Sequence, residues 1–472
     1  MNKYYLTTAI PYVNAPPHVG HALEFVQADV VARYRELIGD NVLLLSGGDE
    51  NALKNVQAAE KAGVGVQDFV DKNSDLFSDL AKKLNIEFDI FQKGSSEQHH
   101  KSSQKLWDLC FEKGDIYRKE YKGLYCVGCE LFYEPDELNK KGECFEHPGK
   151  KLEEVSEENY FFKLEKYQKQ IEDLINSDKL KITPEFRKNE VLGFLKKGLK
   201  DISISRTNAR AKNWGVPVPQ DDSQRMYVWF DALNIYQSGI GFGWDEEKYK
   251  KWWPADLHAI GKGIIKFHAI YWPAFLLSAG LELPKSLFVH GYFTVDGQKM
   301  SKTIGNVVDP IELIEKYGVD VLRYYFLREI PSTGDGDFSE RRLKEIYNSD
   351  LANGLGNLVA RVAKLAEKNG VENNETIEEL EPHVATLLDE FNFSEALQFI
   401  WGIISIVDHE INKVKPWELE GDEAKKVISE LAHTVTVIAY NLKPFLPETS
   451  EKILNQFSGK IKSGDGLFPR LT

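Results

Sequence analysis

The sequence has few cysteines for its length, four among 472 residues. Such a small number cannot form the disulfide framework of a small secreted protein, and three of the four lie close to a histidine. The segment from Met1 to Leu6 also lacks the long apolar run and the small-residue cleavage site of a secretory signal. We therefore expect a protein of the reducing cytoplasm.

Long apolar runs and an excess of positive charge are also missing. No stretch reaches the ~18 uninterrupted apolar residues of a membrane span, and the most apolar segment, Ala269 to Ala279, is interrupted by Pro273. Acidic residues outnumber basic ones by 73 to 59, which gives a net charge of −14. We expect no membrane partner, and any RNA must be bound by local patches rather than by a bulk polycation.

What remains is an ordinary globular composition, with 42% hydrophobic and 28% charged residues. Strand-like and helix-like patterns alternate at the start, which predicts a parallel sheet covered by helices. This alternation breaks near residue 115 and resumes near Ile202. From about Phe338 only helical periodicity persists, which predicts a helix bundle.

The predicted class is therefore α/β: a parallel-sheet domain split by an insertion and followed by an all-α bundle. The boundaries are 1–115 and 201–337 for the two halves of the sheet domain, 116–200 for the insertion, and 338–472 for the bundle. The predicted strands are 4–10, 41–45, 226–230, 257–260 and 287–289, and the predicted helices are 18–38, 52–62, 340–369, 380–412, 422–442 and 447–457.

Two histidines lie where the first predicted strand gives way to the first predicted helix, in His18-Val19-Gly20-His21. His18 and His21 are three residues apart and so share one helical face. A helix N-terminus attracts anions, and Gly20 allows a base or ribose to approach the backbone. These residues favour a phosphate or nucleotide site. The alternative is a capped helix whose histidines are merely on the surface.

A second candidate is a loop in which lysines flank a Met-Ser pair. Asp296-Gly297 is a tight-turn signal, and Lys299 and Lys302 follow on either side of Met300-Ser301. Cations held over a triphosphate stabilise the charge that develops as pyrophosphate leaves. The alternative is an ordinary exposed basic loop.

Three of the cysteines form a metal-binding pattern. Cys126, Cys129, Cys144 and His147 give the spacing C-x2-C-x14-C-x2-H. Four protein ligands close a tetrahedral site, so the pattern predicts one structural Zn²⁺ rather than a catalytic one. The alternatives are a redox Cys-x-x-Cys pair and thiols without a metal. Cys110 lies on an apolar stripe and is expected to be a buried thiol.

The histidine segment resembles the HIGH motif, and the lysine segment the KMSKS motif, of class I aminoacyl-tRNA synthetases; Thr303 replaces the last serine. The order of the motifs, their separation and their context all match that class. The resemblance implies a Rossmann-like catalytic domain that forms an aminoacyl-adenylate from ATP, with Mg²⁺ accompanying the ATP, and then charges a tRNA. The implied ATP-binding or catalytic residues are His18, Gly20, His21, Glu24, Lys299, Ser301 and Lys302.

Three more segments resemble the methionyl-tRNA synthetase family: Thr8 to Tyr12, Tyr227 to Ala232 and Phe267 to Ala274. Aromatic rings contact a thioether favourably, by roughly 0.3–1.5 kcal/mol each. The implied methionine-binding residues are Ile10, Tyr12, Asp49, Trp229, Ala232, Tyr236, Ile264 and His268, with Asp49 paired to the substrate ammonium. The alternatives are plain core for Trp229, Tyr236 and Ile264, and a helix cap for Asp49.

Two positions depart from the pattern of that family. It commonly has Asp-Glu-His-Gly after the second strand, where this chain has Asn51 in the third place. It often has Gly-Lys-Asp where this chain has Gly261-Lys262-Gly263. Asn51 still offers an amide for hydrogen bonding, whereas Gly263 offers no side chain.

In the helical third, the resemblance implies that Asn357, Arg361 and Trp417 read a CAU anticodon by stacking and base-edge hydrogen bonds. Taken alone, these residues could equally be a solvated helix face and a bundle cap. The resemblance, which is closest to enzymes with a single zinc knuckle, implies ATP, L-methionine and tRNA(Met) as partners, and we expect a monomer.

Other functions remain as alternatives. Class I enzymes for leucine, isoleucine and valine usually carry a large editing domain, and the insertion predicted here is too short for one. A cysteine enzyme would place its zinc ligands in the catalytic pocket. A zinc-bearing RNA-binding protein with an inactive catalytic domain is an alternative of another class, against which intact His18, His21, Lys299 and Lys302 argue.

Overall fold

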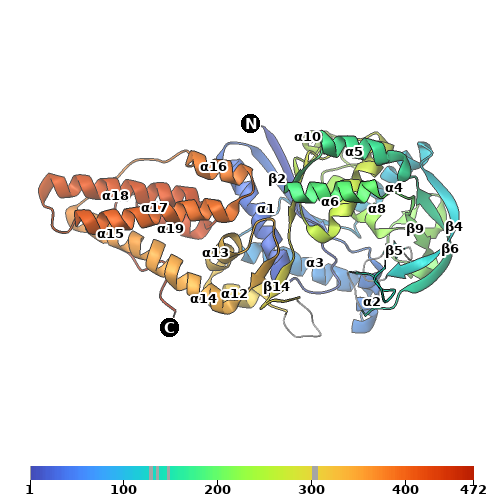
Figure 1. The fold of residues 1–472 in the computed structure, drawn as a ribbon, viewed down its shortest axis with the longest axis horizontal. Coiled ribbons are helices and arrows are strands. Elements are labelled where there is room, and N and C mark those ends of the chain that lie inside the picture. Colours follow the sequence, from blue (N-terminus) through green and yellow to red (C-terminus); the bar gives the residue numbers. More distant parts are fainter. Residues whose placement is uncertain (1, 127–130, 134–137, 146–148, 300–306, 472) are drawn as a thin grey trace.

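The computed structural model describes the whole chain except residues 1, 127–130, 134–137, 146–148, 300–306 and 472. An α/β part and an all-helical part follow one another along the longest axis of the molecule (Figure 1). The described residues include no helix that is long and apolar enough to cross a membrane.

A six-stranded parallel sheet with the order β3-β2-β1-β12-β13-β7 lies at the centre of the α/β part. The order reverses between β1 and β12, and in such sheets ligands bind beyond the carboxyl ends of the strands at the point of reversal. The strands are β1 (Lys3–Thr7), β2 (Asn41–Gly48), β3 (Ile90–Lys93), β7 (Lys181–Thr183), β12 (Leu257–Gly261) and β13 (Ser286–His290). Four of the five predicted strands are thereby confirmed.

Helices cover both faces of this sheet and bury two apolar cores. One core contains Phe25 of α1 and continues through α13 into the helical part, so that the two parts of the molecule share it. The other core contains Trp107, Phe230 and Phe275. The helices are α1 (Val19–Leu37), α2 (Leu53–Ala62), α3 (Val66–Lys83), α4 (Glu97–Glu112), α11 (Trp272–Ala279), α12 (Pro310–Tyr317) and α13 (Val319–Glu329).

The prediction of a strand at 226–230 is wrong. A strand ends at Met226, and the residues after it form the short helix α8 (Val228–Ala232). A short continuous apolar run does not distinguish a buried strand from a buried helix, which explains the error. The small antiparallel sheet here consists of β9 (Ser205–Thr207), β10 (Pro217–Val218) and β11 (Asp221–Met226).

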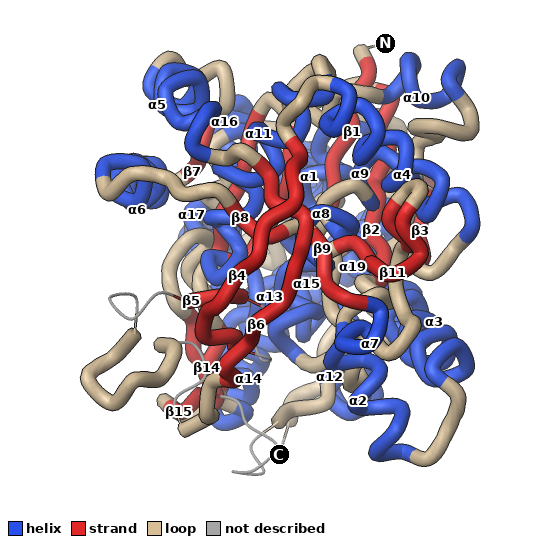
Figure 2. Tube along the Cα trace, turned by 90° about the vertical axis from the view of Figure 1, so that its right-hand side faces the viewer, coloured by secondary structure: helices blue, strands red, loops and turns tan. Residues whose placement is uncertain are grey.

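The insertion is built on a long antiparallel ribbon of β4 and β6, which is seen face-on in Figure 2. The sheet has the order β5-β4-β6-β8, with β4 (Ile116–Cys126), β5 (Leu131–Tyr133), β6 (Glu153–Phe162) and β8 (Ile202–Ser203). Residues 181–183, which the sequence assigned to the insertion, instead form β7 and pair with β13 at the edge of the main sheet. A three-residue strand is too short to show a period of its own.

Shorter elements complete the α/β part. They are η2 (Glu165–Tyr167), α5 (Gln168–Asn176), α6 (Glu185–Lys196), α7 (Asn208–Ala211), α9 (Ile235–Ser238), α10 (Glu246–Trp252), η3 (Lys262–Ile264), the π-helical turn η4 (Phe267–Tyr271), β14 (Phe293–Val295), β15 (Gln298–Lys299) and β16 (Gly336–Phe338).

The predicted helix bundle is confirmed. The run predicted over 340–369 is helical throughout, and the run over 380–412 divides into two helices near Phe391, whose φ is 59°. The elements are α14 (Glu340–Ile346), η5 (Tyr347–Gly356), α15 (Asn357–Asn369), β17 (Glu372–Asn373), α16 (Pro382–Asp389), α17 (Phe393–Val414), α18 (Gly421–Leu442), α19 (Pro447–Gln456) and β18 (Gly459–Lys460).

A fully buried arginine joins the two parts. Arg323 of α13 pairs with Asp29 of α1 at 2.6 Å and donates to the carbonyls of Leu84, Pro444 and Phe445. A buried guanidinium needs partners for its donors, and these contacts supply them. The C-terminal half of α1 is therefore fixed to the connection between α18 and α19.

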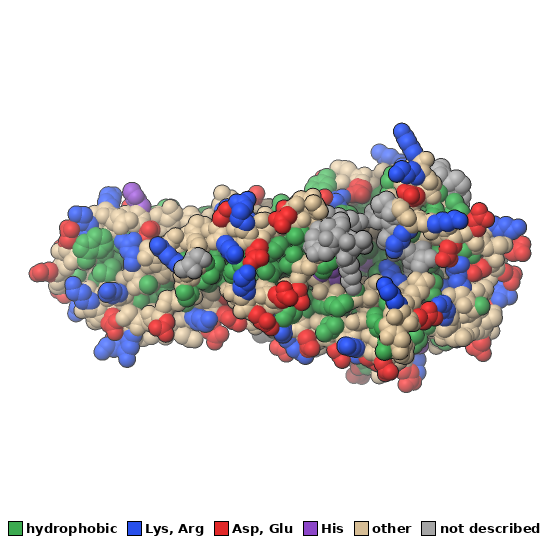
Figure 3. Space-filling view, turned by 90° about the horizontal axis from the view of Figure 1, so that it is seen from below, with side chains coloured by type: hydrophobic (Ala, Val, Ile, Leu, Met, Phe, Trp, Pro, Cys, Tyr) green, Lys and Arg blue, Asp and Glu red, His purple; other side chains and the backbone are tan. Residues whose placement is uncertain are grey.

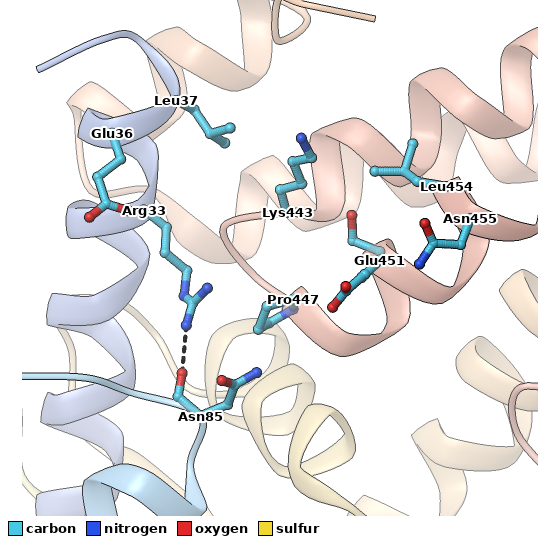
Figure 4. A pocket seen from close by; sticks show the side chains of 10 residues that line it. Arg33, Glu36, Leu37, Asn85, Lys443, Pro447, Glu451, Leu454 and Asn455 are labelled. Carbon is cyan, nitrogen blue, oxygen red and sulfur yellow. Dashed lines mark hydrogen bonds between the residues drawn. The ribbon is translucent and has the colours of Figure 1, made fainter. Parts of the chain in front are cut away.

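A polar depression of about 560 Å³ lies beside this junction, between the C-terminal half of α1 and α19 (Figure 4). Arg33, Glu36, Lys443 and Glu451 contribute charges of both signs to its lining. It lies at the end of α1 opposite to His18, so it is not part of the predicted nucleotide site.

Candidate active site

The two histidines cap the first turn of α1. The Gly20 N–H donates to His18 Nδ1 at 3.1 Å, and the His18 N–H donates to His21 Nδ1 at 3.2 Å. The two rings stack, with their centroids 4.0 Å apart. The two histidines therefore do cap the helix, as the alternative interpretation states. Capping uses only their Nδ1 atoms, so a phosphate site at the same helix end is still possible.

The capping bonds fix the tautomers of both neutral rings. Because each Nδ1 accepts a backbone N–H, each ring carries its proton on Nε2. Burial and the nearby imidazoles of His18 and His290 hold the pKa of His21 well below its usual value. His21 is thus a neutral ring with an Nε2–H donor, which suits a phosphate oxygen at a helix N-terminus.

Glu24, one turn further along α1, is held by protein groups. Its Oε1 accepts the Ala9 N–H at 2.9 Å, and its Oε2 lies 2.7 Å from Nε2 of His290. These contacts tie α1 to the ends of β1 and β13. The sequence missed His290, which carries no motif and is brought here only by the pairing of strands.

The lysine segment follows a hairpin made by β14 and β15. The predicted turn is confirmed: Asp296 and Gly297 have φ of 47° and 74°, and Asp337 accepts the Gly297 N–H at 2.8 Å. Ser301 and Lys302 lie outside the described residues, and for Lys299 only the backbone is described.

The chain beyond the lysine segment returns to the histidines. The Val19 N–H donates to the Val308 carbonyl at 3.4 Å, so a residue just after the segment touches the first residue of α1. The described chain therefore reaches β15 and is next described from Val307, beside the start of α1. The start of α1 lies beyond the carboxyl end of β1, where a doubly wound sheet binds its ligand.

A cluster of rings surrounds the predicted position of the methionine side chain. Tyr236 OH lies 2.7 Å from His268 Nε2, and His268 Nδ1 lies 2.9 Å from the carbonyl of Ile264. A carbonyl only accepts, so Nδ1 carries the proton of the neutral ring and Nε2 accepts the Tyr236 hydroxyl. Burial lowers the pKa of His268 to about 4, which keeps the ring neutral. His268 lies in the π-helical turn η4.

Trp229 and Tyr12 form another wall of this cluster. The Trp229 ring stacks on Phe267 with centroids 3.6 Å apart, and Tyr12 meets Trp229 edge-on at 6.1 Å. The Trp229 Nε1–H is buried, with no hydrogen-bond partner among the described residues. A buried donor of this kind calls for a water or a ligand. Ala232 lies on the same helix and is also buried, and Ile10 is half-buried.

Asp49 is placed by the backbone at the end of β2. It pairs with Tyr12 in a parallel bridge, and its N–H donates to the Pro11 carbonyl at 2.9 Å. The following helix, α2, has Ala52 as its N-cap, so Asp49 is not the cap that the sequence allowed as an alternative. Asp49 is 3% exposed, and its bridge to Tyr12 places it beside the aromatic cluster.

A buried network of hydrogen bonds connects the segments that carry Asp49 and Trp229. Asn51 Nδ2 donates to Asp231 Oδ2 at 2.7 Å, and His99 Nε2 lies 2.6 Å from Asp231 Oδ1. Burial alone would raise the pKa of Asp231, but the charge and hydrogen bond of His99 lower it. The departure at Asn51 therefore still leaves a bonded side chain, which ties the loop carrying Asp49 to the helix carrying Trp229. The sequence did not indicate Asp231 or His99.

Two of the four predicted zinc ligands are described. The sulfurs of Cys126 and Cys144 lie 3.3 Å apart and both residues are buried, packed with Leu152. Cys129 and His147 lie outside the described residues. Within the described part of the chain, no group of three or more His, Cys, Asp or Glu is arranged to bind a metal.

The predicted anticodon residues lie on the bundle. Asn357 begins α15 and is exposed, and Trp417, 45% exposed, follows α17. Arg361 is held by α17: it pairs with Asp408 at 2.6 Å and donates to Asn412 Oδ1 at 2.9 Å. On the face shown in Figure 3, the described basic and acidic side chains are interspersed over both parts of the molecule.

Comparison with known proteins agrees with this geometry. The profile of the family described as "tRNA synthetases class I (M)" matches residues 4–363. The methionine–tRNA ligase of Thermotoga maritima is 42% identical over 480 residues, covering 98% of this chain and 76% of its own, and that of a Nostoc species is 41% identical, covering 96% and 89%.

Solved structures show the same relationship. The Mycobacterium tuberculosis methionyl-tRNA synthetase in complex with methionyl-adenylate matches with a TM-score of 0.92 at 37% identity and covers 100% of both chains. The apo form of that enzyme matches with a TM-score of 0.84 at 34% identity. Fold and site thus define a class I aminoacyl-tRNA synthetase. Within that class, the chain belongs to the methionyl-tRNA synthetase family.

Proposed function

We propose that this chain is a methionine–tRNA ligase, which activates L-methionine with ATP and transfers it to the 3′ end of tRNA(Met). The observation that carries the proposal is the contact between Val19 and Val308, which places residues that follow the lysine segment in the chain beside the histidine-capped start of α1. The aromatic cluster around Tyr236 and His268 lies in the same α/β part and provides a neutral, ring-lined site for a thioether.

The first step is in-line attack of the methionine carboxylate on the α-phosphate of ATP, and it needs no nucleophile from the protein. The protein accelerates the step by holding the two substrates in position and by stabilising the negative charge that develops on the phosphates. His18 and His21 offer neutral Nε2–H donors to phosphate oxygens, and Lys299 and Lys302 offer cations as pyrophosphate leaves. Ser301 and Gly20 are the remaining ATP-binding residues of the sequence prediction. Mg²⁺ binds together with the ATP.

Recognition of methionine divides into a charged and an apolar part. Asp49 pairs with the α-ammonium, while Ile10, Tyr12, Trp229, Ala232, Tyr236, Ile264 and His268 surround the side chain. A neutral His268 suits this role because a charged ring would be costly next to a thioether. Such a pocket discriminates a methyl-sized difference by only ~10–200-fold.

Transfer requires the correct tRNA. We propose that Asn357, Arg361 and Trp417 read the CAU anticodon, the aromatic ring by stacking and the polar groups at base edges. Because Arg361 is held by Asp408 and Asn412, its guanidinium is oriented before RNA arrives. We expect the ligase to act as a monomer in the cytoplasm, where its tRNA is found.

The insertion would hold one structural Zn²⁺ through Cys126, Cys129, Cys144 and His147. Two thiolates at ~2.3 Å from a tetrahedral zinc lie about 3.8 Å apart, close to the 3.3 Å between Cys126 and Cys144. We expect one zinc per chain by metal analysis, and loss of that zinc in Cys144→Ser. Cys110→Ala removes a buried thiol elsewhere and should keep the metal. Full zinc content in Cys144→Ser would refute the site.

ATP–pyrophosphate exchange with each amino acid in turn tests the function. We expect exchange with methionine, little with leucine, isoleucine or valine, and charging of a tRNA(Met) transcript but not of one with an altered anticodon. Lys302→Ala should slow exchange and leave methionine affinity nearly unchanged. Exchange with no amino acid would instead support the RNA-binding alternative.

A further inference from the structure

The carboxyl end of β12 carries a glycine whose side-chain space is already occupied. A Cβ built on Gly263 would lie 2.5 Å from the hydroxyl oxygen of Tyr292 and 3.3 Å from two carbons of its ring. A methyl group at 263 therefore cannot coexist with this position of the tyrosine. The space of the missing side chain at 263 is filled by the phenol of Tyr292, which lies in the connection between β13 and β14.

Tyr292 is held firmly in this place. Its N–H donates to Asp335 Oδ1 at 2.8 Å, and its carbonyl accepts the Gly336 N–H at 2.9 Å. Lys262 lies 4.3 Å over its ring and pairs with Asp335 at 2.7 Å. A tyrosine fixed by backbone and cation contacts presents its hydroxyl at low cost in conformational entropy.

The position lies at the surface, near the carboxyl ends of the strands where the sheet order reverses. Gly263 is exposed and follows β12, the strand beside β1 at the reversal of the sheet. Tyr292 is 39% exposed and comes shortly after His290, whose ring touches Glu24 of α1. With the phosphates of ATP at the start of α1, we expect the nucleoside of ATP to extend along the carboxyl ends of β1 and β12.

We propose that the hydroxyl of Tyr292 binds a ribose hydroxyl of ATP, and that residue 263 is glycine because Tyr292 fills its side-chain space. A phenol both donates and accepts, as a ribose hydroxyl does, so one can bond the other in either sense. The inference rests on the proposed function, since it assumes that ATP binds at the carboxyl ends of β1 and β12.

Exchange measured with ATP, 2′-deoxy-ATP and 3′-deoxy-ATP tests the contact. We expect Tyr292→Phe to raise the KM for ATP about five- to tenfold, as for one lost hydrogen bond, without changing the KM for methionine. We also expect the wild-type enzyme to discriminate against one deoxy-nucleotide by a similar factor, and Tyr292→Phe to lose that discrimination. Equal discrimination by both proteins would overturn the contact.

The glycine is tested separately. Gly263→Ala should raise the KM for ATP when Tyr292 is present and have little further effect in a Tyr292→Ala background, because the two changes remove the same contact. Independent, additive effects would overturn the link between the two positions. A lower melting temperature with unchanged nucleotide discrimination would show that Tyr292 is only structural. Failure of the proposed function would instead appear as a wild-type chain that exchanges with no amino acid.

Discussion

Glu24 and His290 lie 2.7 Å apart, carboxylate oxygen to Nε2, and this contact binds the first turns of α1 to the end of β13. The other ring nitrogen of His290 lies 2.9 Å from the Gly291 carbonyl. Both ring nitrogens therefore face an oxygen atom, one of a carboxylate and one of a backbone carbonyl. The pair holds the helix that presents His18 and His21.

Glu24→Gln should weaken that attachment, because an amide oxygen is a weaker hydrogen-bond acceptor than a carboxylate. We expect the free energy of unfolding to fall by roughly 1–3 kcal/mol and exchange to slow with it. Differential scanning calorimetry and pyrophosphate exchange on the same samples measure both quantities. Glu36→Gln, an exposed position on the same helix, should change neither. Exchange lost without any change in melting temperature would mean that Glu24 touches the nucleotide instead.

Substitutions of His21 can separate capping from catalysis. Asparagine places an acceptor where Nδ1 lies and keeps the bond from the His18 N–H, but it has no donor at the position of Nε2. Glutamine offers an N–H near that position. We expect His21→Asn to reduce the exchange kcat by about 10²–10³-fold and His21→Gln to reduce it less, with similar melting temperatures. Equal losses accompanied by destabilisation would assign His21 to the cap alone.

The lowered pKa of His268 makes a prediction about pH. The ring is neutral well above its pKa of about 4, so the KM for methionine should be flat from pH 8 to about 5.5. It should rise only as the pH nears 4, because a protonated Nε2 no longer accepts the Tyr236 hydroxyl. An inflection near pH 6.5 that disappears in His268→Gln would contradict this assignment.

The same pKa links His268 to stability. The unfolded chain protonates this ring near pH 6.5 and the folded chain near 4, so its contribution is complete above pH 6.5 and falls as the pH drops towards 4. The whole change amounts to roughly 3 kcal/mol. Thermal unfolding between pH 7 and 5 should therefore depend less steeply on pH in His268→Gln than in the wild-type protein.

Trp417→Ala should separate the two halves of the reaction. We expect weaker charging of tRNA(Met), through a higher KM for tRNA, and unchanged pyrophosphate exchange, because stacking on an exposed indole contributes ~1–3 kcal/mol per base. Ile406→Ala, which removes an exposed apolar side chain from α17, is the matched control and should charge normally. If exchange falls as much as charging, Trp417 has a structural role.

Structure that depends on a few neighbouring residues could be predicted from the sequence at two sites, whereas contacts between distant segments could not. His18 to His21 and the Asp296-Gly297 turn lie within single short segments, and their local structure agrees with the sequence pattern. Asp231, His99 and Asn51 lie far apart along the chain, and only the folded structure brings them together. A buried polar residue has no periodic signal, since its partner can be anywhere in the chain.

A different limit, which is local, explains the error at the helix that carries Trp229. The run from Met226 to Phe230 is apolar throughout, so neither a period of two nor one of 3.6 can be detected in it. The resemblance to a family nevertheless assigns Trp229 to the predicted methionine site, because motif matching does not depend on the type of secondary structure.

Helix α1 has 19 residues and is preceded by its N-cap, His18. Further along the helix, Asp29 is bound by the buried Arg323. Each residue of a helix turns the chain by about 100° and advances it by about 1.5 Å. Inserting or deleting one residue between Glu24 and Asp29 would therefore swing the imidazoles of His18 and His21 by about a quarter of a circle while the far end stayed anchored. The length of this helix is thus as constrained as its chemistry, and conservative replacements inside it will be tolerated far better than any change in residue number.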